Sequence, residues 1–421
     1  MSGWRPGQKG RARFWALILG LVVLTGVLSA STTYAVVSHA YSSGVPAELR
    51  GVSGYWEFLR VWRILKTEYV EPVDPERMME GAIRGLVQSL DDPYSGYMEP
   101  EHYKEMKVHT SGTYVGVGIV VEQKGDYTVV VSPFQGTPAQ KAGLKPGDRI
   151  VEVDGKDVVG IPVDAVVKMI RGPRGTEVVL TVVPAGREEP REVRLTRALI
   201  SIPSVEHRML EDRIGYIRLS QFTSKTAREV RRALDALAGQ GMEALVLDLR
   251  HNPGGLLDQA VEVAELFVPR GPIVHLVDRE GNRTTYSSDS EGASYPLAVL
   301  VDGGSASASE IVAGAIQDRK AGVVVGSRTF GKASVQNIHD LPEGAGLRLT
   351  TARYLTPSGR AIDKVGLEPD VLVEPPGGAS RERVPPGAQE TPEHPPEGAG
   401  EGEADPVLQE AVRLLHERLG S

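Results

Sequence analysis

The sequence contains no cysteine, which excludes disulfide bonds, thiolate metal ligands and a cysteine nucleophile together. It has no His-Glu-x-x-His pattern or comparable ligand spacing, so we expect neither a metal nor another cofactor. Long runs of lysine and arginine are absent and the formal net charge is −8, so nucleic acid is not an expected partner. Any covalent chemistry therefore falls to serine, threonine, lysine or a carboxylate.

The chain has 421 residues, enough for about two to four domains. A hydrophobic fraction of 41% allows at least one substantial core. The 48 glycines and 29 prolines exceed average usage but stay below the low-complexity range. We therefore expect a loop-rich globular protein with disorder confined to segments.

Residues 1–40 are predicted to form an N-terminal membrane anchor or signal segment. Four basic residues precede an apolar run from Phe14 to Val37, which is long enough to span a bilayer. The basic flank favours a cytoplasmic N-terminus, which would place the rest of the chain on the periplasmic or extracellular side of the cell envelope. Small residues around Ala30 and Ala35 leave open the alternative of signal-peptide cleavage and secretion.

Residues 41–110 are predicted to be helical and to act as a dimerisation arm. Apolar residues recur at helical spacing from Trp56 to Leu65. A second helix is expected from Pro75 to Leu90, with Asp74 as its cap. The cluster Asp91–Tyr97 then ends it, and we interpret its carboxylates as turn and cap residues rather than a catalytic pair.

Residues 111–195 are predicted to form a small β-rich domain, because short β-branched runs alternate with glycine turns. The expected elements are strands at Gly116–Glu122, Tyr127–Ser132, Arg149–Val153 and Glu177–Val183 and a helix at Asp164–Ile170.

Residues 196–375 alternate strands and helices, which predicts a βαβ core with a largely parallel sheet. Functional loops are then expected at the carboxyl ends of its strands. The expected strands are Ile214–Leu219, Ala244–Leu249, Leu297–Val301 and Gly322–Gly326, and the expected helices are Thr226–Ala238, Leu256–Phe267 and Ser307–Asp318.

The C-terminal part divides in two. Residues 376–405 are rich in proline, glycine and glutamate and are predicted to be a disordered linker. Residues 406–421 form an expected amphipathic helix that docks on the body or on a partner. The fold class is therefore α/β (mixed), with a β-rich domain inserted between a helical region and a βαβ core.

Two motifs at expected strand ends could take part in acyl transfer. In Asp248–Gly255 a glycine pair can turn backbone N–H groups toward an oxyanion, although a plain strand-to-helix turn needs the same glycines. In Gly303–Glu310 a serine occupies a sharp strand-to-helix turn, as hydrolase nucleophiles do. The alternative is a capping box between Ser307 and Glu310, and the two interpretations are compatible.

A third motif, Phe330–Gln336, offers a base. Lys332 lies between apolar residues, and desolvation would lower its pKa enough for it to accept a proton near neutral pH. Most lysines are solvated surface charges. His251, beside the glycine pair, is the rival base.

In this order, and after a small β domain, the three motifs resemble those of the carboxyl-terminal processing peptidases, or tail-specific proteases. These are serine proteases with a PDZ domain. The resemblance extends from about residue 50 to 375 and includes further segments in each region. They are Glu80–Ile83 through Ser89–Asp91 in the helical region, Gly116–Ile119 and Ala142–Asp148 in the PDZ-like domain, and Tyr354–Arg360 in the core.

The resemblance implies a catalytic role for each motif. Ser307 is the implied nucleophile, Lys332 the base and Gln336 the residue that orients it. The implied oxyanion donors are the N–H of Ala308 and one from the Gly254–Gly255 turn, with the choice of glycine open. The resemblance also implies that His251 has no catalytic role and that Ser305 and Ser309 are supporting residues. The family usually has Leu-Asp-Pro-His where this chain has Asp91–Tyr94, and we expect that departure to affect local packing only.

The implied function is endoproteolysis near the C-terminus of protein or peptide substrates with apolar C-termini. PDZ domains add a peptide as an edge strand and hold its carboxylate on backbone N–H groups. The candidate loop is Gly116-Val117-Gly118-Ile119, and an ordinary strand start is the alternative. Arg171 could link the PDZ domain to the protease by a charge contact, or be a solvated surface residue.

Two other functions remain open at this point. One is a membrane-anchored PDZ adaptor with an inactive protease fold. The other is an oligomeric scaffold in which the helical arms matter most. A homodimer and an adaptor or regulator protein are compatible with each of them and with a protease.

Overall fold

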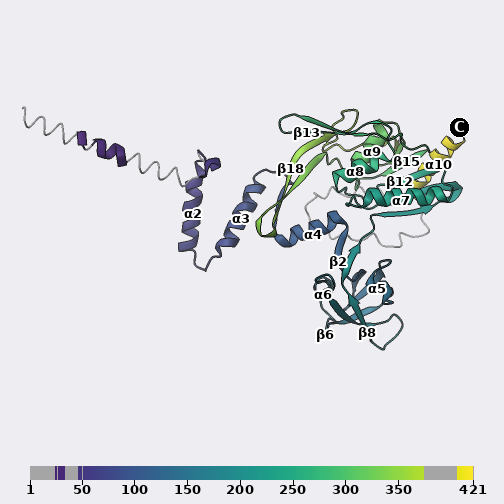
Figure 1. The fold of residues 1–421 in the computed structure, drawn as a ribbon, viewed down its shortest axis with the longest axis horizontal. Coiled ribbons are helices and arrows are strands. Elements are labelled where there is room, and N and C mark those ends of the chain that lie inside the picture. Colours follow the sequence, from purple (N-terminus) through teal and green to yellow (C-terminus); the bar gives the residue numbers. More distant parts are fainter. Residues whose placement is uncertain (1–23, 26, 34–45, 50, 374–404, 421) are drawn as a thin grey trace, which may run out of the picture. The chain divides into compact units, whose positions relative to one another are not determined.

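The structure is a computed structural model that describes residues 24–25, 27–33, 46–49, 51–373 and 405–420 (Figure 1). The chain divides into two compact units, Met1–Ile83 and Arg84–Ser421. Most of the predicted anchor, Phe14–Val37, and nearly all of the predicted linker lie outside the described residues. Within the part that is described, no helix is long and apolar enough to cross a membrane.

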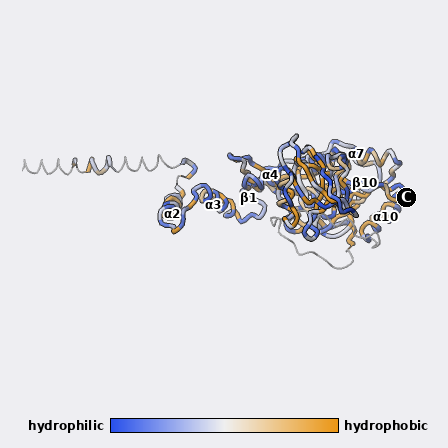
Figure 2. Tube along the Cα trace, turned by 90° about the horizontal axis from the view of Figure 1, so that it is seen from below, coloured by the Kyte–Doolittle hydropathy of each residue, from blue (hydrophilic) through white to orange (hydrophobic). Residues whose placement is uncertain are grey.

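The first unit is helical, as predicted. It holds the 3₁₀ turn η1 (Ala47–Leu49), helix α2 (Gly54–Glu68) and the start of α3 (Pro75–Gln88). The carboxylate of Asp74 accepts the N–H of Glu76 at 2.9 Å, which confirms the predicted cap. Neither helix buries a residue, and hydrophobic and hydrophilic residues alternate along both (Figure 2).

The second unit contains the expected β-rich domain, an antiparallel sheet in the order β3-β4-β5-β7-β8. Its strands are β3 (Ile119–Lys124), β4 (Tyr127–Pro133), β5 (Arg149–Val153), β7 (Glu177–Val183) and β8 (Arg191–Thr196), with β6 (Lys156–Asp157) on β5. Helices α5 (Pro138–Lys141) and α6 (Val163–Ile170) complete it, and β2 (Thr113–Gly116) pairs with β9 (Ala198–Ser201) beside it. The first predicted strand splits into β2 and β3 because Gly118 takes a φ of +83°.

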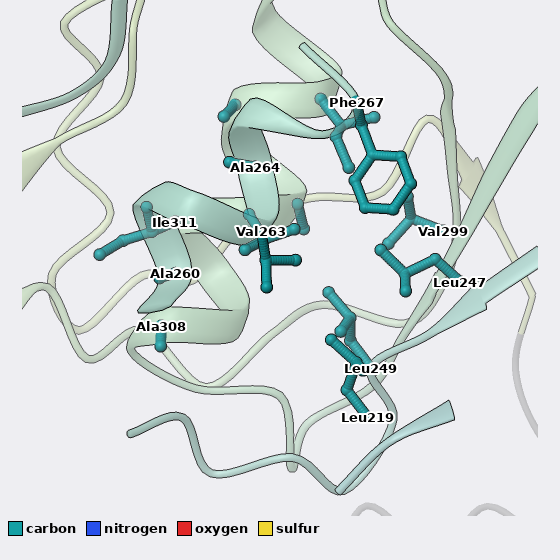
Figure 3. Packing of buried hydrophobic residues seen from close by; sticks show 14 of the residues in the cluster. Leu219, Leu247, Leu249, Ala260, Val263, Ala264, Phe267, Val299, Ala308 and Ile311 are labelled. Atoms are coloured by element: carbon teal, nitrogen blue, oxygen red, sulfur yellow. The ribbon is translucent and has the colours of Figure 1, made fainter. Parts of the chain in front are cut away.

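The predicted βαβ core is confirmed. Strands β11 (Ile214–Leu219), β12 (Ala244–Asp248), β15 (Leu297–Val301), β16 (Val323–Gly326) and β19 (Val371–Leu372) are parallel. Strand β10 (Val205–Met209) pairs antiparallel with β11, and the turn η2 (Glu211–Arg213) connects the two. Helices α7 (Thr226–Gly239), α8 (Leu257–Glu265) and α9 (Ala308–Asp318) cover one face, and α10 (Pro406–Leu419) covers the other. Figure 3 shows α9 against α8, with strand leucines below.

A second antiparallel sheet was not predicted. It has the order β1-β18-β13-β14, with β17 also on β18. Its strands are β1 (Gly96–Met98), β13 (Gly271–Asp278), β14 (Arg283–Ser288), β17 (Ser334–Asp340) and β18 (Gly346–Leu355), with η3 (Pro342–Gly344) in the hairpin; α4 (Pro100–Ser111) follows β1.

Strand β1 corrects the prediction that Asp91–Tyr97 is only a turn. Gly96 pairs with Arg348 and Met98 with Gly346, so the chain after α3 becomes an edge strand on β18. A three-residue strand has no periodicity of its own, and its partner is about 250 residues away in the sequence. The pairing places Gly96–Met98, near the start of the second unit, on the same sheet as β17, the strand that begins two residues after Lys332.

Candidate active site

Ser307 lies in the turn between β15 and α9, at the carboxyl end of a fully buried strand. Its backbone has φ 54° and ψ −112°, a conformation that costs free energy for any residue with a Cβ. Two neighbouring hydroxyls hold the turn. Ser305 Oγ donates to the carbonyl of Leu249 at 2.8 Å, and Ser309 Oγ donates to that of Asn252 at 2.9 Å. Both are thus structural supports.

The glycine pair after β12 packs directly against this serine turn. A Cβ added to Gly254 would lie 2.7 Å from the carbonyl oxygen of Ala306 and 2.9 Å from the Cβ of Ser307. A Cβ on Gly255 would lie 2.1 Å from the carbonyl oxygen of Phe222. Glycine is therefore required at both positions by close packing as well as by their positive φ angles.

Asn252, to which the sequence analysis gave no role, joins the two turns. Its buried Nδ2 donates to Leu219 at 2.9 Å, and its carbonyl accepts the N–H of Ala306 at 3.0 Å. Its Oδ1 accepts the N–H of Gly254 at 2.9 Å. The N–H of Gly254, one of the two candidate oxyanion donors, is therefore already hydrogen-bonded. The N–H of Gly255, the other candidate, has no hydrogen-bond acceptor among the described residues.

Lys332 lies in the loop between β16 and β17, and two groups tie its backbone to that of Ser307. Oε2 of Glu310 accepts the N–H of both residues, each at 2.9 Å. The hydroxyl of Tyr354 donates to both carbonyls, at 3.1 Å for Ser307 and 2.9 Å for Lys332. The fold thus brings together the two motifs that lie 25 positions apart.

Glu310 is fully buried and serves more than the capping role expected from its spacing to Ser307. Its Oε1 accepts the hydroxyl of Thr329 at 2.5 Å and the N–H of Gly331 at 2.8 Å. Burial raises the pKa of Glu310, although its four hydrogen-bond donors oppose that shift. The side chain is the structural link between helix α9 and the lysine loop.

The environment of Lys332 lowers its pKa to about 8. Burial is the main cause, because it disfavours the charged ammonium, and the positive charge of Arg348 adds to it. Asp92 and Glu310 act in the opposite direction. With this pKa about a tenth of the lysine is neutral at pH 7, and that fraction can accept a proton.

His251, the rival base, is directed to another partner. Its side chain is 72% exposed, and its Nδ1 lies 2.9 Å from a carboxylate oxygen of Asp302. That hydrogen bond raises the pKa of His251, which favours the protonated ring. Among the described residues, the ring makes this contact with Asp302 and has no hydrogen bond to Ser307.

Gln336 lies on β17, one side of the hairpin that follows Lys332. Its Nε2 donates to Ser334 Oγ at 2.9 Å and to Thr350 Oγ1 at 3.3 Å. Among the residues described, no hydrogen bond joins it to Lys332. Its assignment as the orienting residue stays a prediction.

The candidate carboxylate loop leads into β3, a free edge of its sheet that has α6 beside it. The carbonyls of Val117 and Gly118 accept from Ala139 and Phe134, each at 3.0 Å. Their N–H groups have no recorded partner within the described chain. Arg171, at the end of α6, lies over the ring of Tyr114 with its guanidinium carbon 5.5 Å from the centroid.

Comparison with known proteins decides the family. The carboxyl-terminal-processing protease of Synechocystis sp. is 40% identical over 323 residues, which cover 75% of this chain and 76% of that relative. The chain belongs to the carboxyl-terminal-processing protease family. Models of peptidase family S41, the PDZ domain and the activating protease CtpB N-terminal domain match residues 213–373, 105–183 and 28–102. The resemblance drawn from the sequence is thereby confirmed.

Further relatives agree. The carboxy-terminal-processing protease of Bartonella bacilliformis is 42% identical, over 75% of this chain and 74% of that relative. The carboxy-terminal processing protease CtpA of Bacillus subtilis is 35% identical, over 85% and 77%. A solved structure named photosystem II D1 C-terminal processing protease is 35% identical and covers 77% of this chain and 94% of its own, with a TM-score of 0.46.

Proposed function

We propose that this member of the family is a serine endopeptidase that cleaves proteins near their C-termini with Ser307 as nucleophile and Lys332 as base. One observation carries the proposal. A single oxygen of Glu310 accepts the N–H of both residues, which fixes the nucleophile and the base beside one another. No metal or other cofactor takes part in the proposed reaction.

The proposed acylation begins when the neutral amine of Lys332 takes the proton of Ser307 Oγ, which attacks the scissile carbonyl. The two side chains are not hydrogen-bonded to each other among the described residues, and such contacts commonly tighten when substrate binds. The oxyanion is bound by the N–H of Gly255 and that of Ala308, the first residue of α9. When the tetrahedral intermediate collapses, the peptide C–N bond breaks and the leaving amine takes the proton from Lys332. Water, activated by the neutral amine of Lys332, then hydrolyses the ester on Ser307.

In this proposal the PDZ domain selects the substrate. Its free edge strand β3 pairs with the last residues of the substrate, and the N–H groups of Val117 and Gly118 bind the terminal carboxylate. The apolar side chains that pack with β3 and α6 favour an apolar C-terminal residue. Gly116 and Ile119 flank that loop, and Arg171 is a proposed regulatory contact.

The proposed location is the outer face of a membrane, with residues 1–40 as an anchor or cleaved signal. A homodimer through the helical arm and an adaptor or regulator protein are proposed partners. The carboxyl-terminal processing of a protein substrate is the activity on which the other proposals rest.

Three variants of the full chain test the dyad on a quenched fluorescent peptide with a free apolar C-terminus. We expect Ser307→Ala and Lys332→Ala to abolish cleavage with unchanged circular dichroism, because each removes a reacting group. His251→Asn, which tolerates the positive φ at that position, should stay active. Near-normal activity of Lys332→Ala together with an inactive His251→Asn would overturn the assignment of the base. Binding of the peptide without cleavage by the unmodified chain would favour the inactive adaptor.

A further inference from the structure

Tyr94 lies over the amine of Lys332. The Nζ atom is 4.7 Å from the centroid of the tyrosine ring, within the range in which an aromatic face attracts a cation. Tyr94 belongs to the segment whose sequence predicts a turn with an effect on local packing only. The contact instead places an aromatic ring at the group proposed to change its charge during the reaction.

The segment that carries Tyr94 is fixed on both sides. Asp92 accepts the N–H of Tyr94 at 3.1 Å and the hydroxyl of Ser95. Arg348 Nε donates to the carbonyl of Tyr94 at 2.8 Å, and the N–H of Thr350 donates to Ser95 Oγ at 3.0 Å. Pairing of β1 with β18 continues directly after these bonds. The ring is therefore held in place by its backbone and not by chance packing.

We propose that Tyr94 is a positioning residue that holds the amine of Lys332 and stabilises the ammonium that forms when the lysine takes the proton of Ser307. The proton moves from Ser307 Oγ to Lys332 Nζ, and the serine oxygen bonds to the substrate carbonyl. The positive charge thus appears under the ring face as the transition state is reached. An interaction that is stronger with the ammonium than with the amine favours the transition state over the ground state.

The charged groups around the amine act in opposite directions. Arg348 from β18 disfavours the ammonium, whereas Asp92 and Glu310 favour it, and among the described residues neither carboxylate forms an ion pair with it. Burial raises the pKa of Tyr94, and the negative charge of Asp363 adds to that effect. A carboxylate in direct contact would keep Lys332 protonated at rest, whereas an aromatic face stabilises the cation more weakly. The base can therefore be neutral in the resting enzyme and still be stabilised when charged.

The inference rests on Lys332 being the base, and Tyr94→Leu in the full chain tests it. Leucine keeps the amine desolvated but removes the ring face. Above about pH 9, where Lys332 is mostly neutral at rest, we expect kcat on the fluorescent peptide to fall about 3- to 30-fold with little change in KM. The midpoint of the rise of kcat/KM with pH should move down by about 0.5 to 1.5 pH units. Tyr94→Phe should recover most of both changes, since it retains the face without the hydroxyl.

Further variants separate the ring's role from structural damage. Tyr127→Leu is the matched control, because Arg149 lies over that ring at 4.9 Å in the PDZ domain, and its pH midpoint should equal that of the unmodified chain. If Tyr94→Leu melts well below the unmodified chain, Tyr94→Met replaces it in the same comparison. A midpoint that stays or rises in the ring-free variants, or a Phe variant as impaired as Leu, overturns the inference. Retained activity of Lys332→Ala would instead overturn the proposed dyad itself.

Discussion

The two sheets that matter for function differ in how their strands are buried. Every residue of β12 and β15 in the protease core is buried, because helices cover both faces of that parallel sheet. In the PDZ domain, β8 alternates exposed and buried residues. The proposed catalytic residues therefore lie in the turns where the core strands end, whereas the proposed ligand site of the PDZ domain is the edge strand β3. In the proposed function, chemistry and recognition use different parts of a sheet, so they should fail in different ways.

The largest loss of activity is expected from Glu310→Ala, which removes a buried carboxylate from the candidate active site. Four donors, three of them backbone N–H groups, would lose their acceptor, and each such loss costs about 1–3 kcal/mol. We expect kcat to fall about a thousandfold and the melting temperature to drop, because only the hydroxyl of Tyr354 would remain of the two groups that join the serine turn to the lysine loop. Steady-state kinetics and a thermal melt measure both.

Glu280→Ala is the matched control, since that side chain is exposed. It should change neither quantity. Full activity of Glu310→Ala would show that the two loops hold their positions without the carboxylate, and would remove the main support for the dyad.

The next effect concerns pH. Because the pKa of Lys332 is lowered to about 8, the neutral base is scarce below that pH and dominant above it. We expect kcat/KM to rise about tenfold per pH unit up to about pH 7 and to level off above about pH 9. His251→Asn should give the same curve. A flat profile from pH 5 to 9 would contradict a lysine base.

The smallest effect should come from the PDZ edge. A Cβ at Gly118 would lie 2.4 Å from that of Thr137, and Gly118 has a positive φ, so Gly118→Val distorts the proposed carboxylate loop. We expect KM for a peptide with a free C-terminus to rise about tenfold, with kcat nearly unchanged. The same peptide with an amidated C-terminus is the control and should show no difference between variant and parent. A fall in kcat for both peptides would mean that the two sheets are not separate in function.

Sequence patterns predicted the buried parallel strands well, because a continuous apolar run between turns defines both ends of such a strand. The bounds of β11 and β15 agree with prediction to the residue. The motifs placed Ser307 and Lys332 at strand ends for the same reason. The sheet of β13, β14, β17 and β18 was not predicted, since its pairing depends on distant partners.

The finer parts of the site needed three-dimensional contacts. The two candidate oxyanion donors of the glycine pair differ in the structure, because the N–H of Gly254 donates to Oδ1 of Asn252. Tyr94 could not be connected to Lys332 from the sequence, because the connection runs through the pairing of β1 with β18. A tyrosine next to a proline in a turn cluster gives no local sign of such a partner.

The backbone of Ser307 has a further consequence. At φ 54° and ψ −112° glycine would be the more stable residue, yet glycine has no hydroxyl to offer. If Ser307 is the nucleophile, as proposed, backbone strain and activity are opposed at this position, because the residue that relieves the strain cannot carry out the reaction. A change to glycine would then remove the activity without any cost in backbone strain.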